Sequence, residues 1–585
     1  MNLRFLVLAG PRVARARIVR RAGLDADPVL RPRSSGQILE VWAPGGTPVA
    51  VSADGAAIVI GSLLQRSESC HRCDPGGADW APAVLLANCW GPYLAFGERD
   101  GDGHFALRDP SGAVVAYHRR DDGCDIYASD DDLIWRGARA APAPDLGFIR
   151  EWLTYPFLRG ARTGVAGVNE LMPGQTLVAA GREITLDQAW TPASHFPARR
   201  GSLDATTAVR RLRETLLDCV PRLVPPGQHP VLKLSGGLDS SLVAAALAHA
   251  DRPFTAVTFA TRDRDGDERH YARAVAEACG AELIEIVEDP GEIVLDPAPG
   301  GRLRPPRQPL LQRLDRAYSD QWAASAPDLV ITGAGGDNVF AALPTAVAAS
   351  DAWSRSGPLA ALRTVRDLAA VHDCTVWKAL GHARRRAQRG SVRRWPADTR
   401  FLTADAIAPG PEPHPWLVNT GKALPGSVEH LRMIAGTWRF LGDPAPDAPA
   451  MLHPLLAQPI LELCLAIPSW LWVSGGRDRA IARAALADLL PGTVLERRSK
   501  GGLGAMFRGQ FEQLARPLGE LLIEGRLAEA GVVDRGAVMR YLARCQQWDD
   551  GQWLRLLDLA AAEQWLRAFD IAAQQPVPTV PPDRG

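Results

Sequence analysis

The sequence predicts a β-rich N-terminal region of α+β type, followed by an α/β domain with a parallel sheet and extra helices. Two observations predict this division. Up to about residue 195, short apolar runs such as ARIV, QILEVWA and AAIVIGSLL alternate with turns rich in Gly, Pro and Asp. From about residue 204, predicted helices alternate with short apolar strands, which is the pattern of βαβ units.

The elements of the α/β part follow one another in the order that this fold requires. The predicted helices are ATTAVRRLRETLLDCV, SLVAAALAHA and DERHYARAVAEACG, and the predicted strands are HPVLKL, FTAVTFA, ELIEIV and DLVITG. From about 345 to 570 the pattern is mostly helical, with many Trp and Arg residues. We therefore expect three parts, namely 1–195, 204–570 and a Pro-rich tail at 571–585, with a connector at 192–203 between the first two.

The composition is that of an ordinary globular protein. The chain has 585 residues, and its 66 basic and 66 acidic side chains cancel, so nothing favours a nucleic-acid or membrane-surface partner. No apolar stretch approaches the ~18 residues of a membrane span, and the N-terminus does not read as a secretory signal. Nine scattered cysteines suit a reducing compartment. These features predict a soluble, cytoplasmic protein of two or three domains.

The stretch VLKLSGGLDSS is the most informative part of the chain. A short strand runs into two glycines, which allow a tight turn and a close approach to a ligand, and then into an alanine-rich helix. The first N–H groups of such a helix bind anions. The residues of this predicted pyrophosphate cradle are Leu234, Ser235, Gly236, Gly237, Leu238, Asp239 and Ser240. Asp239 adds a carboxylate suited to Mg²⁺. No Walker motif is present, and SGG-x-DS instead resembles the signature of the ATP pyrophosphatases.

A second Gly-rich turn, ITGAGGDN, follows another strand about a hundred residues later. Alone it is a weak signal, but in the same α/β domain it can supply Asp337 as a second acidic ligand for Mg²⁺ opposite Asp239. Thr332 and Gly333 would then lie beside ATP. Between the two turns, the strand end with Thr258 and Phe259 is a candidate for the adenine pocket.

A lysine further on, Lys500, stands in RRSKGG after a predicted helix. ATP pyrophosphatases form an acyl-adenylate from ATP and a carboxylate, and an attacking amine then gives a tetrahedral species. The ammonium group of Lys500 could reach the phosphate cleft and neutralise charge on both of these species. A single Lys near arginines is more often a solvated residue, so this role depends on the resemblance described next.

The three segments, in this order and spacing, resemble the synthetase domain of the asparagine synthetase superfamily, an adenine nucleotide alpha hydrolase-like fold. GHFALRDPSGAVVAY and GVNELMPGQTL likewise resemble the glutaminase (Ntn-type) domain that precedes it. That domain uses a cysteine directly after the initiator Met as its nucleophile. Residue 2 is Asn here, and the first cysteine is Cys70. Without that thiolate glutamine cannot be attacked, so we expect a catalytically inactive N-terminal domain and an amine from another source.

The second Gly-rich turn also departs from better-known relatives. Asparagine synthetases have Glu at the position of Ala334, and β-lactam synthetases have Tyr. The cysteine-less N-terminus together with SGGLDSS, GAGGDNVF, GGRDRA and RRSKGG is most similar to lasso peptide cyclases. The resemblance implies adenylation of an Asp or Glu side chain in a ribosomal precursor peptide, and attack by the peptide's N-terminal amine to form an isopeptide macrolactam. It also implies a leader peptidase and a leader-recognition protein as partners.

On this resemblance ATP and Mg²⁺ are the cofactors, Asp239 and Asp337 hold the metal, and Lys500 stabilises the transition state. The base that deprotonates the amine is left unassigned, with Glu462 and His453 as candidates. Two alternatives stay open. One is a small-molecule amide or β-lactam synthetase, and the other is a non-catalytic scaffold that binds a peptide or a protease.

Three further patterns are better explained without a site. Cys70 and Cys73 have zinc-like spacing, but no second pair follows. The acidic run from Asp263 to Glu268 lacks the spacing of a calcium loop. The arginines between Arg384 and Arg394 most simply form a solvated face, with guidance of an acidic peptide as the alternative.

Overall fold

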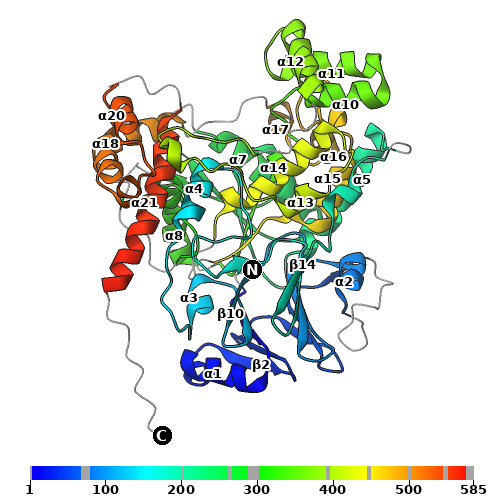
Figure 1. Cartoon of the computed structure of the whole chain (residues 1–585). Helices are drawn as coiled ribbons and strands as arrows, with labels where there is room; N and C mark the ends of the chain where they lie inside the picture. The colour runs from blue at the N-terminus through cyan, green and yellow to red at the C-terminus, as the bar shows by residue number, and fades with distance from the viewer. Residues whose placement is uncertain are drawn as a thin grey trace.

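The computed structural model describes residues 3–66, 80–198, 202–260, 267–287, 295, 302–325, 327–389, 395–443, 449–497, 504–544 and 551–574. Its N-terminal region is rich in antiparallel strands, and a parallel sheet with many helices follows. The two fold types that the sequence predicts are therefore confirmed in outline. Figure 1 shows the N-terminal sheets at one end of the molecule and the helices at the other.

Two six-stranded antiparallel sheets form the N-terminal region. The first has the order β12 (Asn169–Glu170), β10 (Tyr117–Asp121), β11 (Cys124–Ala128), β1 (Leu6–Ala9), β3 (Leu39–Ala43), β2 (Arg31–Ser35). The second has the order β14 (Glu183–Asp187), β13 (Thr176–Ala180), β9 (Gly103–Arg108), β8 (Tyr93–Arg99), β5 (Ala57–Gly61), β4 (Val49–Val51). Alternate residues such as Val41, Ile58 and Phe96 are buried in one cluster, so the sheets pack face to face. A small ribbon, β6 (Leu64–Gln65) and β7 (Cys89–Trp90), lies outside them.

One predicted strand is a helix. The run ARIV lies inside α1 (Arg12–Ala22), whose buried residues include Ala14, Ile18 and Ala22. These are spaced by four, so they form one face of a helix, whereas a strand would bury every second residue. Three further helices of this region are α2 (Pro82–Asn88), α3 (Asp131–Trp135) and α4 (Leu146–Thr154).

A five-stranded parallel sheet lies at the centre of the second part. Its order is β17 (Glu282–Val287), β16 (Thr255–Ala260), β15 (Val231–Lys233), β18 (Leu329–Thr332), β19 (Ala450–Leu452). The chain builds outward from β15 to β16 and β17 on one side, and β18 lies on the other. Between β15 and β18 the direction of winding changes, and such a switch point opens a crevice beyond the carboxyl ends of the strands. The strand β19 was not predicted.

Helices cover both faces of this sheet. Leu232, Ala256 and Ile331 pack in a core shared with α5 (Ala205–Arg222), α6 (Leu238–His249) and α7 (Arg269–Ala278). The alternate residues Val231, Val257 and Val330 face the other way and meet α8 (Pro309–Ser325). The predicted helices and strands of residues 204–333 are thus confirmed within a few residues at their ends.

The rest of the described chain is mostly helical, as predicted. Its helices are α9 (Gly336–Val339), α10 (Val347–Ser356), α11 (Pro358–Val371), α12 (Val376–Arg389), α13 (Pro415–Val418), α14 (Pro425–Leu441), α15 (Gln458–Ala466), α16 (Ala480–Ala485), α17 (Gly492–Glu496), α18 (Gly504–Ile523), α19 (Arg526–Glu529), α20 (Arg535–Leu542) and α21 (Trp553–Gln574). The first residues of the predicted tail therefore continue a helix. Figure 1 shows α10–α12 projecting from the end opposite the N-terminal sheets. Among the described residues, no helix has both the length and the apolar character to cross a membrane.

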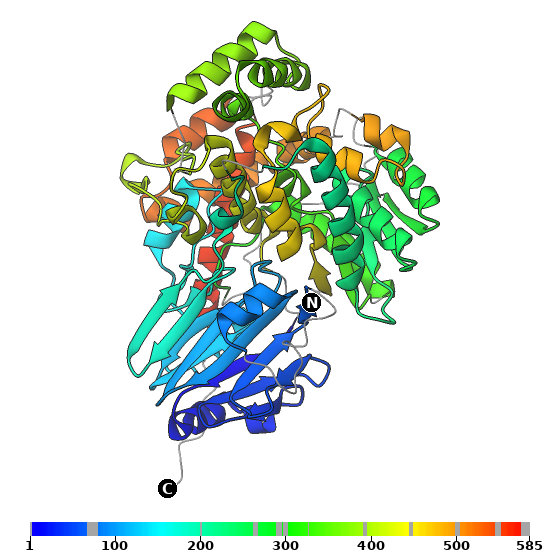
Figure 2. The ribbon, with the colours of Figure 1, turned by 90° about the vertical axis from the view of Figure 1, so that its right-hand side faces the viewer.

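The two parts share buried surfaces. Tyr93 and Leu107 from the second N-terminal sheet lie in the same core as Leu212 of α5 and Leu461 of α15. The outer face of the first sheet and its helices share another core with α18–α21. Figure 2 shows the blue N-terminal strands directly against the helices of the second part. The N-terminal sheets are therefore packed into the rest of the chain.

A buried ionic cluster joins the same two parts. Glu170 is 3% exposed and forms ion pairs with Arg108 at 2.6 Å, Arg159 at 2.9 Å and Arg304 at 2.8 Å. Arg159 also binds Asp443 at 2.5 Å. Burial acts to raise the pKa of Glu170, but the charges of the three arginines outweigh it and hold that pKa below its usual value.

Glu170→Gln is therefore expected to lower the free energy of unfolding by about 3–5 kcal/mol, because three buried guanidinium groups lose a shared counter-charge. Urea denaturation followed by tryptophan fluorescence measures this change. Glu183→Gln, at an exposed position of β14, is the matched control and should change stability by less than about 0.5 kcal/mol. Equal stability of the two variants would show that Glu170 does not stabilise the junction.

Candidate functional site

The loop after β15 is shaped by glycine and closed by serine hydroxyls. Gly236 has a φ of 68°, and a side chain there would meet the backbone of Ala272 at 2.7 Å. The Ser240 hydroxyl donates to the Gly237 carbonyl at 3.2 Å and lies 3.4 Å from the Ser235 hydroxyl. Gly237 caps α6, whose first turn contains Asp239. The loop therefore presents a helix N-terminus and two hydroxyls at the carboxyl edge of the sheet.

The second Gly-rich turn presses directly against the first. A Cβ atom on Gly333 would lie 2.4 Å from the Ser240 nitrogen, and one on Gly336 would lie 2.3 Å from Cγ of Asp239. Any larger residue would push the loops apart, so both positions require glycine. Asp337 follows in the first turn of α9. The two predicted carboxylates thus come together on either side of the switch point between β15 and β18.

Arg479 joins these carboxylates. Its Nη1 donates to Asp337 Oδ1 at 2.5 Å and to Asp239 Oδ1 and Oδ2 at 3.2 and 3.3 Å. The side chain is 14% exposed, and its φ of 50° is in the left-handed region at the start of α16. Burial acts to lower the pKa of Arg479, but the charges of Asp239, Asp337 and Asp478 raise it above its usual value. A cation therefore occupies the position between the two carboxylates.

A second arginine supports the first loop from the other side. Arg497 donates to the Gly236 carbonyl at 3.4 Å, forms an ion pair with Glu268 and lies over the ring of Tyr271 at 4.2 Å. These contacts tie the loop to α7 and to the segment after α17. Glu268, assigned from the sequence to a solvated loop, in fact anchors this arginine.

The remaining predicted nucleotide contacts are divided between two faces. Thr258 is buried at 1% exposure, whereas the Phe259 ring lies 6.3 Å from the ring of Tyr318 in α8. Consecutive residues of a strand point to opposite faces, so the two side chains point to different sides of this strand end. That the strand end lines the adenine pocket stays a prediction. The Thr332 hydroxyl accepts the Ala334 N–H at 3.1 Å and is hydrogen-bonded to His453 Nδ1 at 2.7 Å.

The two candidate bases are engaged in other contacts. Burial lowers the pKa of His453 to about 3, and the positive charges of Lys233 and Arg307 act in the same direction. Glu462 accepts hydrogen bonds from Arg66 at 2.8 Å, Trp190 at 3.0 Å and Gln458 at 2.8 Å. Burial acts to raise the pKa of Glu462, but these bonds keep it below its usual value. Glu462 therefore contributes to the contact with the N-terminal region.

The donor set at the switch point fits a magnesium nucleotide. Mg²⁺ in proteins is usually held by one or two carboxylates together with substrate phosphates and water. Asp239 and Asp337 supply two carboxylates around a cation position, and the start of α6 lies beside them. Within the described residues no cluster of three or more acidic, His or Cys side chains could hold a metal without such a substrate.

Several predicted residues lie outside the described part of the chain. Among them are Lys500, the zinc-like pair Cys70 and Cys73, and much of the acidic run before Asp267. In the arginine run, Arg386 is described and forms an ion pair with Glu429. That arginine is therefore structural.

The sequence analysis missed Arg479 and Arg497 as members of the site. Both come from the region between α15 and α18, far along the chain from the Gly-rich loops they contact. Both lie in runs already noted for their resemblance: Arg479 is the second arginine of GGRDRA, and Arg497 is the first residue of RRSKGG.

Comparison with known proteins gives one family and one distant relative. A family model described as asparagine synthase matches residues 211–567. A carboxyethyl-arginine beta-lactam-synthase of Streptomyces clavuligerus is 25% identical over 485 residues, which cover 79% of this chain and 77% of that protein. Two solved structures, an allosteric regulatory enzyme of purine biosynthesis and a B. subtilis glutamine phosphoribosylpyrophosphate amidotransferase, are each 9% identical. Each alignment covers 50% of this chain and 82% of the other, with TM-scores of 0.21 and 0.18.

Proposed function

Because this chain belongs to the asparagine synthase family and is an ATP-dependent, amide-bond-forming ligase, we propose that it closes a macrolactam in a ribosomal precursor peptide. In this proposal ATP adenylates the side-chain carboxylate of an Asp or Glu. The peptide's own N-terminal amine then attacks that carbonyl and forms an isopeptide bond. AMP and pyrophosphate are the other products.

The observation that carries the proposal is the meeting of two Gly-rich loops around a cation position. Asp239 and Asp337 approach Arg479 from opposite sides of the switch point. Mg²⁺ bound between these carboxylates would neutralise part of the charge on the ATP phosphates. The start of α6, with Ser235 and Ser240, faces the same edge of the sheet. Such a helix N-terminus binds the departing pyrophosphate.

The activation step needs an electrophile and a leaving group. A substrate carboxylate oxygen attacks the α-phosphorus of ATP and releases pyrophosphate, which gives an acyl-adenylate. The amine then adds to the acyl carbon, loses a proton and expels AMP. Donors fixed around the first loop stabilise the charge that develops as pyrophosphate leaves. Lys500, on the family resemblance, would do the same for the second step.

The ring-closing step depends chiefly on positioning. The amine and the carboxylate belong to one peptide, so a site that holds both in reach supplies a large effective molarity. Ala334 stands where asparagine synthetases carry Glu and β-lactam synthetases carry Tyr. Its methyl group can neither take up a proton nor donate a hydrogen bond. This difference favours a substrate other than those of the two relatives.

A second candidate is a small-molecule amide or β-lactam synthetase, which the Streptomyces relative favours. Both candidates share adenylation followed by closure of a ring within one molecule. They differ in the size and nature of the carboxylate substrate. A leader peptidase and a leader-recognition protein in the cytoplasm are part of the first candidate only.

An ATP–pyrophosphate exchange assay on the purified full chain tests the proposal. A precursor peptide of the proposed kind is added with its processing protease, and mass spectrometry follows the loss of one water from the peptide. We expect exchange that depends on the peptide, together with a dehydrated product. Exchange supported only by small carboxylates would replace the peptide by the second candidate. Absence of exchange with every carboxylate, in a folded protein, would favour a binding scaffold.

A further inference from the structure

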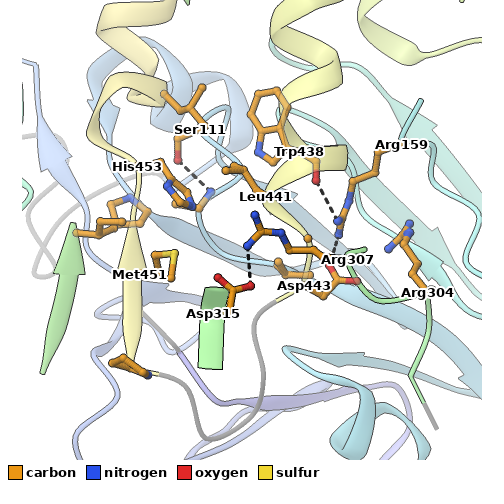
Figure 3. A pocket seen from close by; sticks show the side chains of 18 of the residues that line it. Ser111, Arg159, Arg304, Arg307, Asp315, Trp438, Leu441, Asp443, Met451 and His453 are labelled. Carbon is orange, nitrogen blue, oxygen red and sulfur yellow. Dashed lines mark hydrogen bonds and ion pairs between the residues drawn. The ribbon is translucent and has the colours of Figure 1, made fainter. Parts of the chain in front are cut away.

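A cavity of about 360 Å³ lies between the N-terminal sheets and the parallel sheet. Its walls come from the segment after β7, from residues 302–307, from α8 and from the end of β19. Figure 3 shows His453 and Met451 on one side of this cavity, and Arg159 and Arg304 on the other. This volume is in the range of sites that hold a small organic molecule.

Among the described residues, the charged side chains that line the cavity are predominantly cationic. Seven are positively charged, namely Arg108, Arg159, Lys233, Arg302, Arg304, Arg307 and Arg316. Two lining carboxylates, Asp315 and Asp443, and two behind them, Glu170 and Asp131, form ion pairs with members of this set. Burial raises the pKa of the nearby Asp109 to about 7, so it does not supply a full negative charge at neutral pH. Burial likewise raises the pKa of Asp131 to about 7, and it lowers the pKa of Lys233 to about 8. Among the described residues, seven cations thus face four carboxylates.

These cations differ in how far they open onto the cavity. Arg108 and Arg304 are 0% and 3% exposed, so they lie behind the wall, in the cluster around Glu170. Arg302 and Arg307 are 18% and 32% exposed and can meet a ligand directly. An anion in the cavity would balance the excess of positive charge that the described residues place around it.

The walls between these charges are apolar. Trp90, Leu441, Met451 and Leu456 line the cavity together with several prolines. A small inorganic anion would leave these walls uncovered, whereas an organic anion with an apolar body covers them and meets the arginines with its charged end. We propose that this cavity is a binding site for a small organic anion, such as a carboxylate carried on an aromatic or aliphatic body.

The cavity shares residues with the nucleotide loops. Lys233 is the last residue of β15, directly before the first loop. His453 lines the cavity and is hydrogen-bonded to Thr332, which in turn accepts the Ala334 N–H of the second loop. A ligand in the cavity therefore lies two side chains away from the predicted ATP site. Any coupling between the two sites is reciprocal. Bound ATP would change the affinity of the cavity for the anion, and the bound anion would change the affinity for ATP by the same factor.

The test uses the apolar sulfonate 8-anilinonaphthalene-1-sulfonate as a fluorescent probe on the full chain, without ATP or peptide. We expect saturable binding that 1-naphthoate displaces and that the neutral 1-naphthalenemethanol does not. Because the readout needs no ligase reaction, it is independent of the proposed function. A wild-type protein that binds no probe, or displacement by both naphthalene compounds alike, would overturn the proposal.

Two variants locate the probe. Arg307→Gln removes one charged end of the cavity and should weaken binding about tenfold, while Met451→Trp fills the apolar part and should reduce it similarly. Arg213→Gln is the matched control, since Arg213 on α5 is exposed to about the same extent as Arg307 (30% and 32%) and also forms an ion pair, with Asp488. Unchanged affinity in Arg307→Gln and Met451→Trp, with both variants folded by circular dichroism, would place the probe elsewhere and refute the cavity site.

Discussion

Asp239→Asn is expected to reduce ATP–pyrophosphate exchange by about 10³-fold, which corresponds to about 4 kcal/mol of lost transition-state stabilisation. The amide keeps the size of the side chain and removes only its negative charge. Asp239 is held by Arg479 on one side and lies against Gly336 on the other, so the substitution changes no packing. The loss would come from weaker binding of Mg²⁺ at the switch point. Exchange measured at several magnesium concentrations separates this effect from a fault in folding.

Asp405→Asn is the matched control, because Asp405 is an exposed carboxylate in a short turn remote from both loops along the chain. It should leave exchange unchanged. If Asp239→Asn retains more than about a tenth of the wild-type exchange while both variants unfold at the same temperature, Asp239 is not a metal ligand. The adenylation chemistry would then require another acidic residue.

Arg479→Met is expected to lower exchange by about 10²-fold, the usual cost of removing one fixed donor from a charge-stabilising site. The same variant should need less Mg²⁺ for half-maximal exchange, because Arg479 now competes with the metal for Asp239 and Asp337. A purely structural role for Arg479 would not lower the magnesium requirement. Measuring the exchange rate against magnesium concentration therefore gives two independent readouts from one titration.

Arg479→Lys supplies the conservative comparison. Lysine keeps the charge but not the fork of N–H groups that reaches both carboxylates, so an intermediate exchange rate is expected. Arg516→Met, on the exposed face of α18, controls for the loss of an arginine elsewhere. A magnesium requirement that rises in Arg479→Met, or stays unchanged, would show that this guanidinium does not compete for the metal position.

The sequence predicted the parts of the site that depend on local pattern. The two strands that end at Lys233 and Thr332, the turns after them and the helix α6 all follow from short apolar runs and closely spaced glycines. That the two carboxylates meet also follows, since neighbouring parallel strands end at the same edge. The spacing of hydrophobic residues and the residue types of turns act over a few residues, and they were sufficient to predict these elements.

Other features could not be predicted because they depend on contacts between distant segments. Arg479 reaches Asp239 across 240 positions of the chain, and an arginine between Asp478 and Ala480 carries no local mark of that contact. The run ARIV is too short to distinguish a strand from one face of a helix, and it lies in α1. The strand β19 has three residues in a Pro-rich stretch, and only its pairing with β18 identifies it.

The burial of Tyr93 and Leu107 against α5 and α15 restricts how this gene can change in evolution. A truncated gene that began near residue 204 would encode a polypeptide with a broad apolar surface exposed to water, and such surfaces drive aggregation. Conversely, the first 190 residues alone would leave the complementary apolar surface of the N-terminal sheets exposed. Each half therefore needs the other for its solubility, whether or not the N-terminal half performs any chemistry of its own.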